Sequence, residues 1–90
     1  MYEVLYTHEA RHAIRALRAK ERGQIERAIL RLAEDPGLGK NLTQELSQYR
    51  SYRSGDYRII YRVLHKEIQI IIFFVGNRKS VYSIATRKLS

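Results

Sequence analysis

The spacing of apolar residues changes near the middle of the chain, and this change limits the possible folds more than any other feature. Before Asp35, apolar residues recur every three or four positions, which is typical of amphipathic helices. The two stripes are Ala10, Ala13, Ile14 and Leu17, and Ile25, Ala28, Ile29 and Leu32. From Tyr49 onward, β-branched and aromatic residues alternate with polar ones, as in strands. The pattern predicts an α+β fold, with an N-terminal strand and helix hairpin packed on a small, mainly antiparallel sheet.

Local signals place the elements of the first half. Residues 2–6 alternate in polarity and predict a short strand. A first helix is expected over residues 7–19, with Thr7 as its N-cap. A second helix is expected over residues 20–34, and the Asp-Pro-Gly sequence at 35–37 ends it. Residues 36–46 carry no sustained period and predict a loop.

The second half contains four runs that predict strands. They read YRSYRS, DYRIIYRVL, EIQIIIFFV and SVYSIAT. Their short connections indicate an antiparallel meander, with the helix pair covering one face. The third run is apolar on both faces, so we expect it in the interior of the sheet. His65 falls in the loop before it.

The sequence Ser54-Gly55-Asp56-Tyr57 predicts a hairpin turn, because glycine tolerates the positive φ that tight hairpin turns require. Alternation then puts Tyr49, Ser51, Arg53, Arg58, Ile60 and Arg62 on one face, and Tyr52, Tyr57, Ile59, Tyr61 and Val63 on the core face. Arg53 would lie opposite Arg58, and two like charges so placed repel by up to about 1 kcal/mol. An anion between them would relieve this repulsion, as would a nearby carboxylate or plain solvent screening.

Composition bounds the class of protein. The 90 residues form one domain (1–90), and 17 Lys and Arg against 9 Asp and Glu give a net charge of +8. Such a charge favours an acidic partner, above all nucleic acid or an acidic protein. No apolar run approaches the about 18 residues of a membrane span, and no signal-like segment follows Met1. We expect a cytoplasmic protein with no membrane partner.

His8, Glu9 and His12 match the H-E-x-x-H spacing of zinc peptidases. A catalytic zinc also needs a third protein ligand, and the remaining histidine, His65, has no motif around it. The first helix must use its apolar stripe to cover the sheet, which leaves little room for a zinc site. We therefore expect a surface helix with two incidental histidines, and no metal or other cofactor.

Two motifs in the second half carry a resemblance to a known family. RSGDYRIIYRV (53–63), followed about twenty residues later by VGNRKSVY (75–82), resembles the RelE/ParE toxin superfamily of bacterial and archaeal toxin–antitoxin systems. The helix hairpin ending in Glu-Asp-Pro is also similar to the opening of that family. The resemblance covers nearly the whole chain and implies a RelE-like fold. It also implies an acidic, partly disordered antitoxin that folds on binding.

The better-known branch of that family cleaves messenger RNA on the ribosome without a metal, by attack of a 2′-hydroxyl on the adjacent phosphodiester. The resemblance implies that Arg53 and Arg58 bind phosphate and stabilise transition-state charge. It further implies that Arg78 contacts the scissile phosphate and assists leaving-group protonation. Tyr82 would act on the nucleophile or stack on a base. Arg50, Arg62 and Lys79 are expected to contact RNA as well.

Other interpretations stand beside this one. Tyr82 could be a core aromatic of a last strand, and Arg62 a solvated charge. Ser51 stands where strongly active ribonucleases of the family tend to carry lysine or arginine, and alternation directs the adjacent Arg50 toward the core side or the sheet edge. Asn77 stands where many relatives have histidine. A ParE-like inhibitor that binds DNA gyrase without catalysis, and a plain nucleic-acid-binding module, are the alternative functions.

Overall fold

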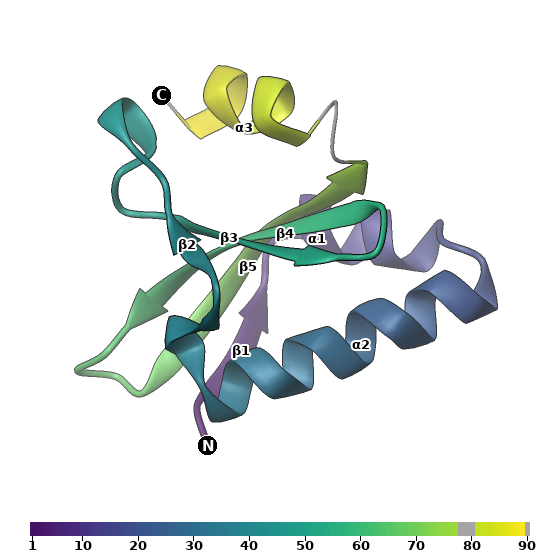
Figure 1. Ribbon diagram of the computed structural model, residues 1–90, viewed down its shortest axis with the longest axis horizontal. Helices are drawn as coiled ribbons and strands as arrows, with labels where there is room; N and C mark the ends of the chain where they lie inside the picture. Colours follow the sequence, from purple (N-terminus) through teal and green to yellow (C-terminus); the bar gives the residue numbers. More distant parts are fainter. Residues whose placement is uncertain (78–80, 90) are drawn as a thin grey trace.

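A five-stranded sheet with helices on both faces forms the fold (Figure 1). The computed structural model describes residues 1–77 and 81–89, except for the side chains at 82 and 89. The strands are β1 (Glu3–Tyr6), β2 (Lys40–Asn41), β3 (Arg50–Ser54), β4 (Tyr57–Leu64) and β5 (Gln69–Asn77), and they lie in the order β1-β5-β4-β3-β2. The helices are α1 (His8–Arg15), α2 (Ala19–Glu34) and α3 (Val81–Leu89), with short 3₁₀ turns η1 (Pro36–Leu38) and η2 (Gln44–Leu46). The predicted α+β class is confirmed.

The helix hairpin forms where the apolar stripes predict it. Thr7 caps α1, because its hydroxyl accepts from the Ala10 N–H at 3.1 Å and donates to the Phe73 carbonyl at 2.8 Å. That helix ends at Arg15, earlier than predicted. Arg22 on α2 reaches back to the carbonyls of Arg15 and Leu17, and these contacts satisfy backbone groups at the end of α1.

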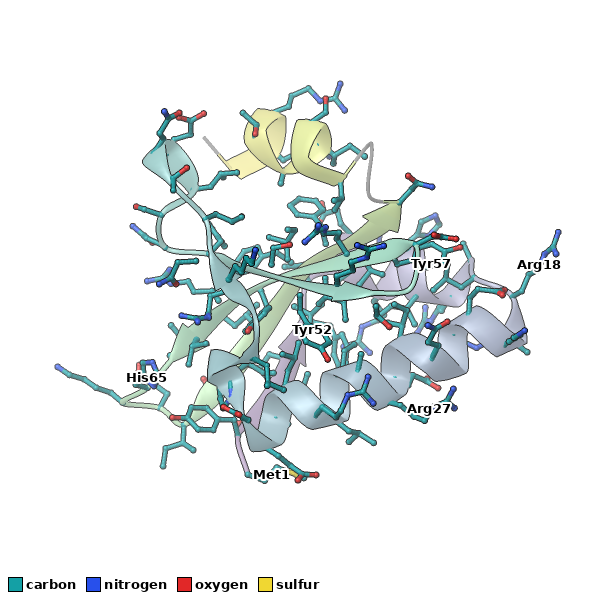
Figure 2. All side chains as sticks on the ribbon, viewed as in Figure 1. Met1, Arg18, Arg27, Tyr52, Tyr57 and His65 are labelled. Carbon is teal, nitrogen blue, oxygen red and sulfur yellow. The ribbon has the colours of Figure 1, made fainter. Side chains whose placement is uncertain are left out.

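The central hairpin has the register that its turn predicts. Arg53 pairs with Arg58 and Tyr52 with Ile59, and Gly55 has a φ of 61°. Tyr52 and Tyr57 pack against the core beneath the helix pair, and Figure 2 shows Tyr52 between the sheet and α2. The run predicted to lie in the interior, β5, is flanked by β1 and β4.

Two strand pairings and one helix differ from the predicted meander. β1 joins the sheet parallel to β5, with Val4 opposite Ile70, and the two-residue β2 adds to the outer edge of β3. The segment SVYSIAT was expected to be a strand, but residues 81–89 form the helix α3. The strand prediction was wrong because β1 and β4 already occupy both edges of β5.

A second apolar cluster forms on the face away from α1 and α2. Val81 and Ala85 of α3 are buried one turn apart, against Ile60 and Phe74 of the sheet. Leu46 of η2 closes the same cluster. This face is therefore covered by α3 and η2 near the junction of β4 and β5.

Candidate functional site

Arg53 and Arg58 lie side by side on adjacent strands, on the face of the sheet that carries α3. They are cross-strand partners in the antiparallel β3–β4 pair, so both side chains leave the sheet on the same side. Arg53 is exposed, and its Nε donates to the Gly55 carbonyl at 3.2 Å. Arg58 is half-buried, and its Nε atom is inaccessible to solvent. The pair combines an exposed cation with a half-buried one.

A hollow of about 310 Å³ lies beside this pair. Its lining consists of Leu38, Lys40, Ser51, Tyr52, Arg53 and Arg58. Three of these residues are cationic, and none of the described lining residues is acidic. The hollow therefore offers positive charge from three neighbouring strands to an anion.

Lys40 was not foreseen from the sequence. It falls in the stretch that predicts a loop, and β2 has only two residues, too few to give a periodic signal. Its partner across the ladder is Ser51, so Lys40 shares the face of Ser51 and of Arg53 two positions further along β3. Only the pairing of β2 with β3 identifies it as a neighbour of the arginine pair.

Arg50 lies on the face of the sheet opposite to Arg53 and Arg58, as alternation predicts. It is therefore not part of the arginine pair. Its guanidinium donates to the Asn41 side-chain oxygen at 2.7 Å and to the carbonyls of Gly39 at 2.7 Å and Gly37 at 3.2 Å. These bonds tie the segment before and through β2 to the edge of β3. The expected contact of Arg50 with RNA stays a prediction.

Tyr61 secures the same segment from the helix-covered face. Its hydroxyl donates to the Pro36 carbonyl at 2.7 Å and accepts from the Gly39 N–H at 3.0 Å. Burial raises the pKa of Tyr61, and the bond from Gly39 opposes this shift in part. A Cβ at position 39 would lie 2.6 Å from the Tyr61 hydroxyl and 2.9 Å from the Ser51 carbonyl, so only glycine fits there.

None of the other predicted site residues is shown beside the Arg53–Arg58 pair by the described part of the chain. Arg62 is half-buried on β4, on the same face as Arg58 but four residues along the strand, and it does not line the hollow. Arg78 and Lys79 lie outside the described residues, and Tyr82 belongs to α3 with a side chain that is not described. The described chain on either side of residues 78–80 is close to the arginine pair, because Gly76 is the cross-strand partner of Arg58.

The H-E-x-x-H sequence lies on the exposed side of α1. His8, Glu9 and His12 are all exposed there. His65 lies in the β4–β5 turn (Figure 2), and its Nδ1 is hydrogen-bonded to the Tyr2 hydroxyl at 3.1 Å. Within residues 1–77 and 81–89, no group of three or more His, Cys, Asp or Glu side chains is arranged to hold a metal ion. None of the helices in the described part of the chain is long and apolar enough to cross a membrane.

Comparison with known proteins identifies the family to which the chain belongs. Residues 4–82 match the family model of the ParE toxin of the type II toxin–antitoxin system parDE. No curated protein sequence matched the chain. The chain belongs to the RelE/ParE toxin superfamily, and it is a toxin of a type II toxin–antitoxin system.

Solved structures agree with this assignment. A chain of the RelBE2 toxin–antitoxin complex from Mycobacterium tuberculosis is 32% identical, with a TM-score of 0.78 over 86% of this chain and 98% of that one. The isolated RelE toxin of E. coli is 21% identical, with a TM-score of 0.75 and full coverage of both chains. The archaeal RelE–RelB complex from Pyrococcus horikoshii contains a chain 23% identical, with a TM-score of 0.65 over 86% of this chain and 94% of that one. The last two likenesses concern the fold alone.

Proposed function

We propose that this toxin is a messenger-RNA endonuclease that acts on the ribosome, in the cytoplasm, and stops translation. The observation that supports the proposal most is the cross-strand pair of Arg53 and Arg58 beside a hollow without an acidic lining residue among those described. Guanidinium groups match the geometry of phosphate oxygens and keep their charge at any physiological pH. A phosphodiester laid across this face would have both its ground-state charge and its developing charge stabilised.

The proposed reaction is an internal displacement at phosphorus. The 2′-oxygen forms a bond to phosphorus, the bond from phosphorus to the 5′-oxygen of the next nucleotide breaks, and a 2′,3′-cyclic phosphate remains. One proton leaves the 2′-hydroxyl and one is delivered to the departing 5′-oxygen. No cofactor or metal is needed to balance this step.

The proposed roles follow the resemblance and the geometry together. Arg53 and Arg58 bind the phosphate and stabilise the additional negative charge. Arg78 contacts the scissile phosphate and assists protonation of the leaving oxygen, and Tyr82 acts on the nucleophile or stacks on a base. Arg62 and Lys79 extend the basic surface along the RNA. The roles of Arg78, Lys79 and Tyr82 rest on the family resemblance.

The proposed protein partner is an acidic antitoxin. The chain has a net charge of +8, and two of the similar structures are the RelBE2 toxin–antitoxin complex from M. tuberculosis and the RelE–RelB complex from P. horikoshii. An acidic segment that orders on binding would neutralise the exposed arginines and keep the toxin inactive until it is removed. Co-expression with the adjacent small gene should relieve toxicity, and the two proteins should copurify.

Inhibition of DNA gyrase is the second candidate function, because the family model that matches residues 4–82 is named for ParE. The two candidates affect different processes first. After induction in cells, pulse labelling with methionine and thymidine should show that protein synthesis stops before DNA synthesis. Ribosomes programmed with a defined message should yield fragments ending in 2′,3′-cyclic phosphate. An early stop of DNA synthesis with an intact message would select the gyrase candidate.

A further inference from the structure

We infer that Lys40 is a third phosphate-contacting residue of the basic site, and that Arg50 and Tyr61 hold it in position. The inference deepens the proposed function and rests on it for the identity of the anion, an RNA phosphate. The residues concerned come from β2, β3 and β4, and the pairing of these strands brings them together.

The ladder register places Lys40 on the correct face. Lys40 is opposite Ser51, and Ser51 precedes Arg53 on the same face of β3 by two positions. Diagonal neighbours of this kind have backbones about 7–8 Å apart, within reach of a lysine side chain. Lys40, Arg53 and Arg58 all line the same hollow. One phosphate in the hollow can therefore meet all three cations.

Ser51 makes room for this arrangement. Its side chain is small, and Ser51 lines the hollow together with Lys40, Arg53 and Arg58. The third cation on this face thus comes from the neighbouring strand and not from β3 itself.

The residues on either side of Lys40 are fixed on the opposite face. Gly39 is bonded through its carbonyl to Arg50 and through its N–H to Tyr61, and Asn41 is bonded through its side chain to Arg50. Because alternate residues of a strand point to opposite faces, these anchors direct Lys40 toward the hollow. Arg50 is by this account a positioning residue that acts through β2.

The positive charge on this face has a cost when no anion is bound. Three cations line one hollow, and like charges on neighbouring strands repel each other. A phosphate bound between the three cations would remove this repulsion. This grouping of cations favours the binding of an anion in the hollow.

Binding of a single-stranded RNA oligonucleotide tests the inference. The probe carries 2′-O-methyl groups, so it cannot be cleaved, and its affinity is measured by fluorescence anisotropy over a series of salt concentrations. Each phosphate contact contributes about 0.7 to the slope of log affinity against log salt for single strands. Lys40→Ala should lower the slope by about that amount and weaken binding several-fold, and Lys40→Arg should retain the slope.

The matched control is Lys66→Ala, in the exposed β4–β5 turn at the far end of β4 from Arg58. It removes the same charge and should leave the slope unchanged. A slope for Lys40→Ala equal to that of the parent, or to that of Lys66→Ala, would overturn the inference. The measurement needs no catalysis, so it decides the role of Lys40 even if the parent cleaves no message.

Cleavage on programmed ribosomes separates this inference from the proposed function. Absence of cleavage by the parent would refute the proposed function alone. If the parent cleaves, Lys40→Ala should reduce the rate at least tenfold, and Ser51→Lys in that background should restore part of it, since it returns an amine to the same face. A rate for Lys40→Ala equal to that of Lys66→Ala would again refute the role of Lys40.

Discussion

Arg53 on β3 and Arg58 on β4 are direct cross-strand partners, so two guanidinium groups leave the sheet on one face beside a hollow that Lys40 also lines. An arrangement of like charges is unfavourable by itself and becomes favourable when an anion joins it. The cations on β2, β3 and β4 thus repel each other in the free protein and attract an anion into the hollow between them. Stability and function should respond in opposite directions when one of the exposed charges is removed.

Gly39→Ala should destabilise the fold, because the new methyl group would lie 2.6 Å from the Tyr61 hydroxyl and 2.9 Å from a backbone carbonyl. Relief of such an overlap commonly costs about 1–3 kcal/mol. Urea denaturation should show a lower free energy of unfolding. Gly37→Ala is the matched control in the same segment, because its methyl group would meet nothing closer than an Asp35 oxygen at 3.6 Å. Equal stability of the two variants would contradict the close packing around Gly39.

The alkaline limit of stability should depend on Tyr61. Burial raises its pKa above the ordinary value of 10.0, so above that pH the unfolded chain loses the proton before the folded one does. The contribution of Tyr61 is complete below pH 10.0 and is lost as the pH rises through its folded pKa. Urea midpoints between pH 9 and pH 11 should fall more steeply for the parent than for Tyr61→Phe. An identical dependence of the urea midpoint on pH in the parent and in Tyr61→Phe would refute the raised pKa of Tyr61.

Ile68→Gly should stabilise the protein. Ile68 has a φ of 55°, a left-handed conformation that strains a β-branched residue, and its side chain is 55% exposed. Release of this strain outweighs the small loss of burial, and the free energy of unfolding should rise by about 1 kcal/mol. Thermal unfolding checks this. Ile68→Val, which keeps the β-branch, should give no gain, and a gain equal to that of glycine would argue against backbone strain.

Arg50 and Lys40 should be coupled in RNA binding. If Arg50 acts by positioning Lys40, Arg50→Ala should lower both the melting temperature and the salt slope of binding, and Arg50→Lys should restore the slope only in part. In the Lys40→Ala background, Arg50→Ala should lower the melting temperature again but reduce the slope no further. Additive losses of slope would instead make Arg50 an independent RNA contact.

The extent to which the sequence predicts this structure differs between its local and non-local parts. The β3–β4 register follows from a two-residue Gly-Asp turn, so the pairing of Arg53 with Arg58 could be predicted. The parallel pairing of β1 with β5 joins residues more than sixty positions apart and has no local signal. The last helix was mistaken for a strand because the β-branched and aromatic residues in SVYSIAT favour strands, and periodicity cannot distinguish a strand from a helix in so short a run. The uncharged Ser51 suggested a missing cation on β3, and the structure places Lys40 directly across the ladder from it.

The most direct test of the central claim is cleavage of a defined message on programmed ribosomes by Arg53→Ala and Arg58→Ala, measured together with thermal unfolding. Each variant should cleave about a hundredfold or more slowly than the parent, because a preorganised contact to the developing charge is lost, and Arg58→Lys should recover only part of the rate. Arg53→Ala should melt at or slightly above the parent temperature, because Arg53 is exposed and faces a like charge. Parental cleavage rates in both folded alanine variants would contradict the account and favour inhibition of gyrase.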